Sequence, residues 1–322
     1  MVRILSESDV ADLLELDALL DVIADAVRKQ DRGDVERPER PHFPVGVGLD
    51  ADAPDEPLGT GLTMPAYLHG ADYYATKLAS VHPGNADRDR PTVNAQVAVT
   101  DAATGAPVAY VAGRRVTNAR TGCIGGVSAR ALADPPVRVG VIGAGAQARW
   151  QTYAIAAALP VDGVRVFSPS ESRFDCAADL RDAGIDAEAA DSAADAVDGA
   201  DVVVTATTAE EPVVADEAIA PDAAVVAVGA YQHGMQELEP ETLRTASAVF
   251  ADVPGEAAET GDATAAGFEA ADLRPLSEAL DEEPRGGRRV VLSVGSAVFD
   301  AATATHLYER AVEADVGRTV DL

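Results

Sequence analysis

Lysine is nearly missing from this sequence of 322 residues. Only Lys29 and Lys77 are lysines, so almost all of its 25 basic residues are arginines, and 54 acidic residues outweigh them to give a formal net charge of −29. Such an acidic, lysine-poor composition is typical of proteins that stay soluble in concentrated salt, where ions screen the repulsion between carboxylates. We predict a halophilic source. Nucleic acid is not expected as a partner, because the sequence offers no basic face to neutralise its phosphates.

Cysteine and long apolar runs are scarce too. Cys123 and Cys176 are the only cysteines, with neither the spacing of a metal site nor a disulfide framework, so we predict no bound metal. No apolar segment reaches the length of a membrane span, and the first ten residues lack the apolar core of a signal peptide. We expect a soluble, cytoplasmic protein with no membrane partner.

Two kinds of pattern follow each other along the chain. Residues 1–32 have helical periodicity, and hairpin-linked strands are expected at 73–81, 92–100 and 108–112, which predicts an α+β domain. After a helix at 117–132 the pattern becomes an alternation of helices with strands, expected at 137–142, 164–167, 201–206, 223–229, 247–251 and 290–294. This alternation predicts an α/β domain with a Rossmann-type doubly wound parallel sheet.

The chain is long enough for about two domains. We place the Rossmann dinucleotide-binding domain at 117–295. The α+β domain, for substrate binding and dimerisation, takes 1–116 and 296–322, and an amphipathic C-terminal helix at 303–314 completes it.

The loop after the strand at 137–142 has the small residues of a dinucleotide site. Gly143, Gly145 and Ala148 have the spacing G-x-G-x-x-A and lead into a helical run. The first glycine permits a tight turn, the second lets backbone N–H groups approach a pyrophosphate, and the alanine lets the helix pack close to the strand. The alternative is an ordinary tight turn, but the flanking strand and helix favour the dinucleotide.

Further motifs occur in order along the chain. They are Pro38-Glu39-Arg40, Met64-Pro65, Lys77-Leu78-Ala79-Ser80-Val81, Pro83-Gly84-Asn85, Pro91-Thr92-Val93, Asn118-Ala119-Arg120-Thr121-Gly122, Ala146-Gln147, Gln236-Glu237-Leu238 and Ser293-Val294-Gly295. With them the chain resembles the ornithine cyclodeaminase/mu-crystallin family over nearly its whole length. That family includes archaeal alanine dehydrogenase and ketimine reductases. The resemblance implies a homodimer, with the hairpin strands as its interface.

The resemblance also implies that Arg40, Lys77 and Arg120 bind the substrate carboxylate. The residues agree, since Lys77 lies in a nearly apolar strand and a buried ammonium is unfavourable without a paired anion. The alternatives are a structural salt bridge or an outward-pointing side chain for Lys77, and a helix-surface position for Arg120. Arg37, one turn from Arg40, is an alternative to it.

Ser168 stands where dinucleotide-binding strands usually end in an acid that accepts hydrogen bonds from the ribose. Hydroxyls with a nearby arginine suit a 2′-phosphate, so we predict NADP(H), with NAD(H) as the alternative. An arginine at the start of a solvent-exposed helix is the other interpretation of Arg173. Strand ends and the resemblance together predict the cofactor-binding set: Thr92, Arg120, Thr121, Gly143, Gly145, Ala146, Gln147, Ser168, Ser170, Arg173, Thr205, Thr207 and Val294. Val294 is also predicted to contact the substrate.

Two positions depart from the cyclodeaminases of the family. Those enzymes have an Asp that activates water for ammonia release where this chain has Tyr231, and a Glu near the substrate amine where it has Leu62. A tyrosine, with a pKa near ~10, is a poor general base at neutral pH. We add Tyr231 to Arg40, Lys77 and Arg120 as the predicted catalytic set, with the proton coming from Tyr231, His233 or water.

These residues predict an NAD(P)-dependent oxidoreductase that acts on the carbon–nitrogen bond of a small amino or imino acid, similar to alanine dehydrogenase or a ketimine reductase. Holding the carboxylate would orient the imine carbon for hydride transfer. One alternative is ornithine cyclodeaminase, a lyase that converts ornithine to proline without net use of the cofactor. The other is a non-catalytic NADP-binding protein, like the crystallins of the family.

Overall fold

The computed structural model of the chain describes residues 1–88, 90–281 and 286–321. Contacts within the chain divide it into two compact units. The first comprises Met1–Glu15, Arg28–Arg120 and Ala297–Leu322, and the second comprises Leu16–Val27 and Thr121–Ser296. The domain limits expected from the sequence stay a prediction, and the contacts group Leu16–Val27 with the second unit. None of the helices in the described ranges is long and apolar enough to cross a membrane.

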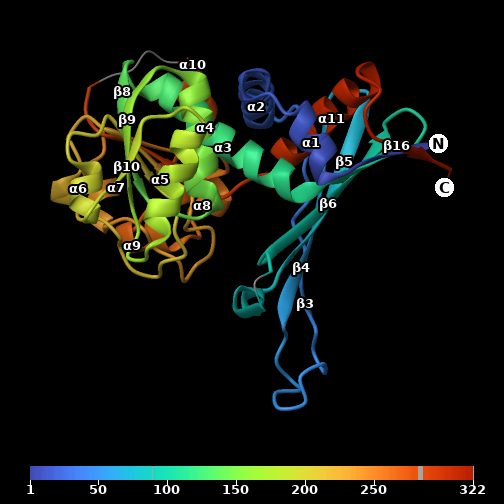
Figure 1. The fold of residues 1–322 in the computed structure, drawn as a ribbon, viewed down its shortest axis with the longest axis horizontal. Coiled ribbons are helices and arrows are strands. Elements are labelled where there is room, and N and C mark those ends of the chain that lie inside the picture. Colours follow the sequence, from blue (N-terminus) through green and yellow to red (C-terminus); the bar gives the residue numbers. More distant parts are fainter. Residues whose placement is uncertain (89, 282–285, 322) are drawn as a thin grey trace. The chain divides into compact units, whose positions relative to one another are not determined.

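The first unit is built on a mixed sheet, eight-stranded in the described part of the chain, with the order β16-β1-β7-β6-β5-β4-β2 and β3 paired to β4. The strands are β1 (Val2–Leu5), β2 (Val35–Glu36), β3 (His42–Val45), β4 (Gly59–Leu68), β5 (Tyr73–Val81), β6 (Val93–Asp101), β7 (Pro107–Ala112) and β16 (Arg318–Val320). Figure 1 shows β4, β5 and β6 as long neighbouring strands. Its helices are α1 (Glu7–Leu13), the 3-10 helix η1 (Pro83–Arg88) and α11 (Ala297–Glu313).

One face of this sheet is buried and the other is open. Helix α11 packs on β4, β5 and β6. Because side chains alternate along a strand, Ala75 and Lys77 of β5 and Val97 of β6 point to the covered face and are buried. Tyr74 and Leu78 of β5 point the other way and are exposed. The alternation seen in the sequence thus explains both the core of this unit and its uncovered face.

The helical interpretation of residues 1–32 is wrong for the first five residues. Residues Val2–Leu5 form β1, which pairs in parallel with β7 and antiparallel with β16, both distant in sequence. Burial of Val2 and Leu5 between these strands outweighs the local helical pattern. Helix α1 starts only after Ser6, whose hydroxyl accepts from Asp9 N while the Asp9 carboxylate accepts from Ser6 N.

The second unit holds a sheet in which every pair of neighbouring described strands is parallel, with the order β10-β9-β8-β11-β12-β15-β13-β14. The strands are β8 (Val137–Ile142), β9 (Val161–Phe167), β10 (Ala187–Ala189), β11 (Val202–Thr205), β12 (Ala224–Ala227), β13 (Ala248–Ala251), β14 (Arg274–Pro275) and β15 (Arg289–Leu292). The helices are α4 (Ala146–Ala158), α5 (Ser172–Asp182), α6 (Ala193–Val197), η2 (Asp216–Ala218), α7 (Pro240–Arg244), α8 (Pro254–Ala257), α9 (Gly261–Ala266), η3 (Ala270–Asp272) and α10 (Leu276–Asp281).

This order confirms the predicted doubly wound sheet. From β8 the chain moves outward to β9 and β10 on one side and then to β11 and β12 on the other, the order of dinucleotide-binding sheets. Both faces carry a core, because Val202 and Val204 of β11 point into one apolar cluster and Val203 into the other. That double burial explains the unbroken apolar run in the sequence of β11.

Helices α2 (Leu16–Asp31) and α3 (Gly113–Leu132) each begin in one unit and end in the other. Within the second unit, glycines of α3 allow very close packing. A Cβ at Gly126 would lie 2.6 Å from Leu20 Cδ2 on α2, and one at Gly122 would lie 2.4 Å from Trp150 O on α4. This packing explains why the contacts place most of α2 with the second unit.

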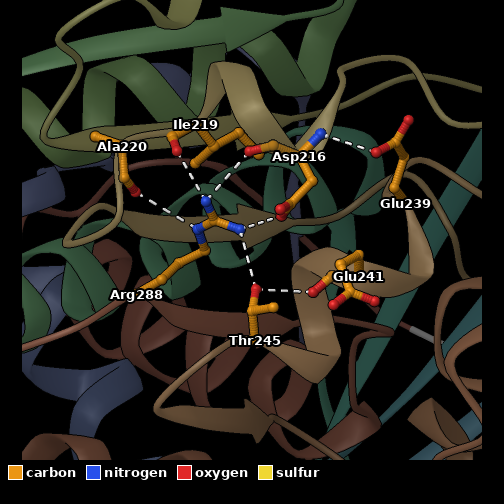
Figure 2. A network of polar contacts seen from close by, with 7 residues as sticks. All are labelled: Asp216, Ile219, Ala220, Glu239, Glu241, Thr245 and Arg288. Carbon is orange, nitrogen blue, oxygen red and sulfur yellow. Dashed lines mark hydrogen bonds and ion pairs between the residues drawn. The ribbon is translucent and has the colours of Figure 1, made fainter.

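A buried arginine ties several loops of the second unit together (Figure 2). Arg288, just before β15, donates to the carboxylate and carbonyl oxygens of Asp216, to the carbonyl oxygens of Ile219 and Ala220, and to the Thr245 hydroxyl. Its side chain is 8% exposed. One cation therefore meets one carboxylate, and the remaining donors are satisfied by neutral oxygens.

Candidate active site

Two cations share one buried carboxylate in the first unit. Lys77 projects from β5, and its register partners Met64 on β4 and Val97 on β6 are apolar. Lys77 Nζ donates to Asp300 Oδ2 at 2.6 Å, and Arg120 Nε donates to Asp300 Oδ1 at 3.0 Å. The exposed fractions of these side chains are 4% for Lys77, 7% for Arg120 and 1% for Asp300. The fold therefore brings together two of the three predicted carboxylate-binding residues.

The electrostatics of this cluster are unbalanced. Burial lowers the pKa of Lys77 to about 8, because desolvation and the charge of Arg120 outweigh the attraction of Asp300. Burial acts to raise the pKa of Asp300, but Arg120 and Lys77 hold it below its ordinary value. Two positive charges thus face one negative charge in a buried place, an arrangement that favours a further anion.

Arg40 adds a third positive charge. It lies half-buried between β2 and β3, and its charge contributes to the lowered pKa of Lys77. Arg40 stays the predicted third member of the trio, with Arg37 as its alternative.

Donors remain in the cluster for an anion. Within the described residues Lys77 hydrogen bonds only to Asp300, which uses one of its three N–H groups, and Arg120 donates only through Nε. A substrate carboxylate accepts from ammonium and guanidinium groups with short, charge-assisted hydrogen bonds. The residues present therefore suit a small carboxylate.

Asp300 was not predicted from the sequence. An acid in the apolar stretch Ala297-Val298-Phe299-Asp300-Ala301-Ala302 was the available signal, since a buried Asp is rare unless it is paired. Its partner could not be identified from the sequence, because Lys77 lies 223 residues away.

The glycine loop of the second unit has the geometry expected of a dinucleotide site. Gly143 has φ +113°, and a Cβ there would lie 2.4 Å from Ala206 O, so the close approach of β8 and β11 requires glycine. At Gly145, the N-cap of α4, a Cβ would meet nothing within 4 Å among the described residues. Packing thus gives no reason for the second glycine, which leaves open space beside the start of α4, as a pyrophosphate requires.

The neighbouring predicted residues take different positions in this loop. Ala146 is exposed and Gln147 half-buried at the start of α4, while Ala148 is buried against the sheet. Arg149, which the sequence analysis did not single out, donates from Nη1 to the carbonyl oxygens of Ala144 and Gly145 at 2.6 and 3.2 Å. It therefore holds the shape of the loop.

Serine hydroxyls gather at the end of β9. Ser170 Oγ lies 3.3 Å from Ser168 Oγ and 2.6 Å from Ser172 Oγ. Arg173 Nη1 donates to the carbonyl oxygens of Ser168 and Ser170, and its guanidinium lies over the Phe174 ring, 4.5 Å from its centroid. Arg173 thus lies in the first turn of α5, where its guanidinium donates back to the loop that precedes the helix.

Glu237 connects the ends of two neighbouring strands. It is fully buried and accepts from Thr205 Oγ1 at 2.9 Å, from N and Oγ1 of Thr207 at 2.6 and 2.8 Å, and from Gly229 N at 2.7 Å. Thr205 is fully buried, whereas Thr207 is half-buried. Of these two predicted residues, only Thr207 reaches the surface of the strand ends.

Asp262 supports the same loop from α9. Its Oδ1 accepts from the backbone N of Glu237 and Leu238 at 2.8 and 2.9 Å. Its Oδ2 is buried with no hydrogen-bond partner in the described part of the chain. Burial raises the pKa of Asp262 to about 6, although these two backbone N–H groups oppose the shift. No local sequence pattern indicates this role.

The remaining predicted cofactor residues belong to different segments of the two units. Val294 N donates to Asp252 Oδ1 at 3.0 Å, which fixes the segment after β15. Thr121, in the second unit, accepts from Gln151 Nε2 through its carbonyl oxygen at 2.8 Å. Thr92 belongs to the first unit, where it is exposed and its carbonyl oxygen accepts from His82 N at 2.8 Å.

Comparison with known proteins decides the family. The model of the ornithine cyclodeaminase/mu-crystallin family matches residues 2–315. This chain belongs to that family. The resemblance expected from the sequence motifs is confirmed.

Three relatives of this family member show what it is similar to. Δ1-pyrroline-2-carboxylate reductase 1 of Burkholderia multivorans is 33% identical over 305 residues, covering 92% of this chain and 91% of that protein. The solved structure of a Thermococcus litoralis Δ1-pyrroline-2-carboxylate reductase with NADH and L-proline has a TM-score of 0.90 and 28% identity, covering 99% and 100%. An archaeal alanine dehydrogenase dimer with bound NAD has a TM-score of 0.88 and 27% identity, covering 99% of each chain.

The loop that distinguishes this ornithine cyclodeaminase/mu-crystallin family member from cyclodeaminases follows β12. Tyr231 there is 45% exposed and His233 is exposed. Leu62 lies half-buried on β4, opposite Ala79 of β5. Neither position offers the carboxylate that the resemblance assigns to cyclodeaminases.

Proposed function

We propose that this protein reduces a small cyclic imino acid, with Δ1-pyrroline-2-carboxylate as the first substrate to test. The chain is an NAD(P)-dependent oxidoreductase that acts on the carbon–nitrogen bond of small amino or imino acids, in line with the similar reductases and dehydrogenase. The observation that carries the finer proposal is the buried cluster in which Lys77 and Arg120 share Asp300.

The trio binds the substrate through its carboxylate. Arg40, Lys77 and Arg120 supply the positive charge, and the fixed direction of their donors sets the orientation of the imine. Their charge also makes the imine carbon more electrophilic by balancing the carboxylate. A bound, reduced nicotinamide dinucleotide supplies the hydride. Tyr231 and His233 are the candidate donors of the proton to the imine nitrogen, and Tyr231→Phe and His233→Asn variants distinguish them through kcat.

The glycine loop holds the dinucleotide. Backbone N–H groups at the start of α4 face the open space beside Gly145, where a pyrophosphate fits. We propose NADP(H) as the preferred form, because the end of β9 offers hydroxyls and Arg173 in place of an acid. The solved relatives hold NADH and NAD, which makes NAD(H) the competing candidate.

The cofactor preference has a direct test. A Ser168→Asp variant introduces the missing acid, and its charge would repel a 2′-phosphate. We expect KM for NADPH to rise about tenfold or more while KM for NADH changes little. Equal effects on both cofactors would contradict the preference, and Ser192→Asp, outside this cluster, is the control for added charge.

Ornithine cyclodeaminase is the rejected alternative. The three relatives described above are imino acid reductases and an alanine dehydrogenase. Tyr231 and Leu62 also lack the carboxylates that ammonia release requires in the family. The non-catalytic crystallin role is the second alternative, and binding of the cofactor without turnover would support it.

We propose that the open sheet face of the first unit forms a homodimer. Tyr74, Leu78 and Tyr110 are 36%, 45% and 39% exposed. Register places Thr76 of β5 opposite Ala98 of β6, and Ala98 opposite Tyr110 of β7, so these side chains share one face. Large exposed apolar patches mark interfaces. Light scattering should give twice the chain mass, and Leu78→Glu should reduce it to the mass of one chain.

We further propose a cytoplasmic protein that is adapted to high salt. The net charge of −29 produces strong self-repulsion, which concentrated salt screens. Activity and the unfolding temperature should both rise when KCl is raised from about 0.1 M to multimolar concentration.

The decisive experiment is a substrate panel at high salt. Consumption of NAD(P)H is measured with Δ1-pyrroline-2-carboxylate, Δ1-piperideine-2-carboxylate, and pyruvate plus ammonia. Net consumption with a cyclic imine supports the proposal, and consumption only with pyruvate plus ammonia would make the protein an alanine dehydrogenase. Formation of proline from ornithine without net cofactor change would contradict the proposed reductase.

A further inference from the structure

We propose that Asp300 is a positioning residue for the reduction: it fixes the directions of Lys77 and Arg120 and keeps Lys77 protonated for the substrate carboxylate. The inference rests on the proposed function of the trio. Asp300 acts through its two partners, because both of its oxygens are engaged and its side chain is 1% exposed.

Asp300 links the lysine of β5 to the arginine of α3. Each carboxylate oxygen accepts from a different partner, Oδ2 from Lys77 and Oδ1 from Arg120. Asp300 itself lies in the first turn of α11, where Phe299 is fully buried. A carboxylate held this firmly fixes both cations, and it leaves two ammonium N–H groups of Lys77 for the substrate.

The charges around Lys77 explain why a carboxylate is needed. Lys77 faces Asp300 from α11, Arg120 from α3 and Arg40 from the segment before β3, while its register partners on β4 and β6 are apolar. Burial and both arginines lower the pKa of Lys77, and only Asp300 raises it. Without Asp300 the pKa of Lys77 would fall further, and neutral lysine would bind a carboxylate poorly.

The charge balance argues against a purely structural pair. In the Arg288–Asp216 contact one cation meets one carboxylate, and neutral oxygens take the other donors. At Asp300 a second cation approaches the same carboxylate, although two buried cations repel each other. In a purely structural ion pair this repulsion would stay uncompensated, whereas in a binding site the substrate anion balances it.

The test compares Asp300→Asn with Asp216→Asn, which weakens the other buried Arg–Asp pair as a matched control. The readout is the pH dependence of kcat/KM for the imino acid. For Asp300→Asn we expect the basic limb to move down by about one pH unit or more, with kcat/KM at pH 7 reduced about 100-fold. For Asp216→Asn we expect the wild-type limb. An unshifted limb in Asp300→Asn would overturn the proposal.

A second variant covers the case in which Asp300→Asn does not fold. Asp300→Glu keeps the charge but displaces it by one methylene, so we expect the wild-type basic limb together with kcat/KM reduced about tenfold. A wild-type kcat/KM in this variant would contradict the positioning role. If wild-type protein reduces no substrate of the panel, the proposed function fails, and the pH dependence of L-proline binding in the same variants tests Asp300 independently.

Discussion

The Lys77–Arg120–Asp300 cluster and the Arg288 network of Figure 2 are both buried ion contacts, yet their composition differs. Arg288 meets one carboxylate and several carbonyl oxygens, so its charge and its donors are all satisfied. Asp300 meets two cations, and the lysine keeps unused N–H groups. Buried ions that are fully paired hold the fold together, whereas an excess of buried charge of one sign indicates a bound ligand of the opposite sign.

This difference predicts opposite responses to the same kind of substitution. Replacing a cation of the Lys77–Arg120–Asp300 cluster should lower kcat/KM and raise the free energy of unfolding. Replacing Arg288 should leave kcat/KM nearly unchanged and lower the free energy of unfolding.

The largest effect is expected for Lys77→Met. The buried methionine removes one cation and leaves a balanced Arg120–Asp300 pair, so the apparent free energy of unfolding at pH 7 should rise by about 1–2 kcal/mol. The substrate loses a charge-assisted partner, and kcat/KM should fall about 1,000-fold, equivalent to roughly 4 kcal/mol. Steady-state kinetics and denaturant unfolding at fixed salt measure both, and unchanged dinucleotide binding is the control. A variant that is both active and less stable would reverse our assignment.

Arg288→Met should give the opposite result. It leaves Asp216 and the carbonyl oxygens of Ile219 and Ala220 without their donor, which costs about 3 kcal/mol of apparent unfolding free energy. At a temperature where the variant is folded, kcat/KM should stay within about twofold of wild type. A loss of activity as large as that of Lys77→Met would remove the distinction between the two clusters.

The titration of Lys77 gives the free energy of unfolding a pH dependence that can be measured. The pKa of Lys77 is lowered in the folded protein to about 8, so the protonated lysine opposes folding below about pH 8, and this opposition disappears as the pH rises toward the ordinary value of 10.5. Between about pH 8 and 10 wild type should therefore gain about 2 kcal/mol of apparent unfolding free energy relative to Lys77→Met. Parallel pH profiles of the two proteins would argue against a buried, protonated Lys77.

The smallest effect is expected at Asp262. Its folded-state pKa of about 6 lies above the ordinary value of 3.8, so its stabilising contribution is full at low pH and is lost as the pH rises through that interval. Asp262→Asn keeps the acceptor for the Glu237 and Leu238 N–H groups and removes the titration. We expect stability at pH 7 within about 1 kcal/mol of wild type and a flatter profile between pH 4 and 6. An unchanged slope in that interval would contradict the assignment.

The sequence predicted the second unit better than the first. Continuous apolar strands such as β11 are a local signal, and the parallel sheet confirmed them. The glycine loop after β8 is a local signal too, and its role as a dinucleotide site stays a prediction. Strand β1 was missed because its stability comes from pairing with β7 and β16, which no local pattern reveals. Long-range pairing of this kind is the part of a fold that local propensity does not encode.

The candidate site shows the same limit. Lys77 stood out because lysine is so rare in this chain and its strand is apolar. Asp300 and Asp262 were not singled out among the 54 acidic residues, and only the fold shows what these two carboxylates bind. In so acidic a sequence, the few buried carboxylates with a role in the site are therefore difficult to recognise.

Calorimetric binding of L-proline at pH 7 and high salt, with the oxidised dinucleotide present, measures directly whether the cluster at Asp300 binds a carboxylate. We expect Lys77→Met to raise the Kd of L-proline about 100-fold or more, whereas Arg288→Met leaves it within about twofold of wild type. Equal Kd values for wild type and Lys77→Met would contradict the claim that the unbalanced cluster at Asp300 receives the carboxylate.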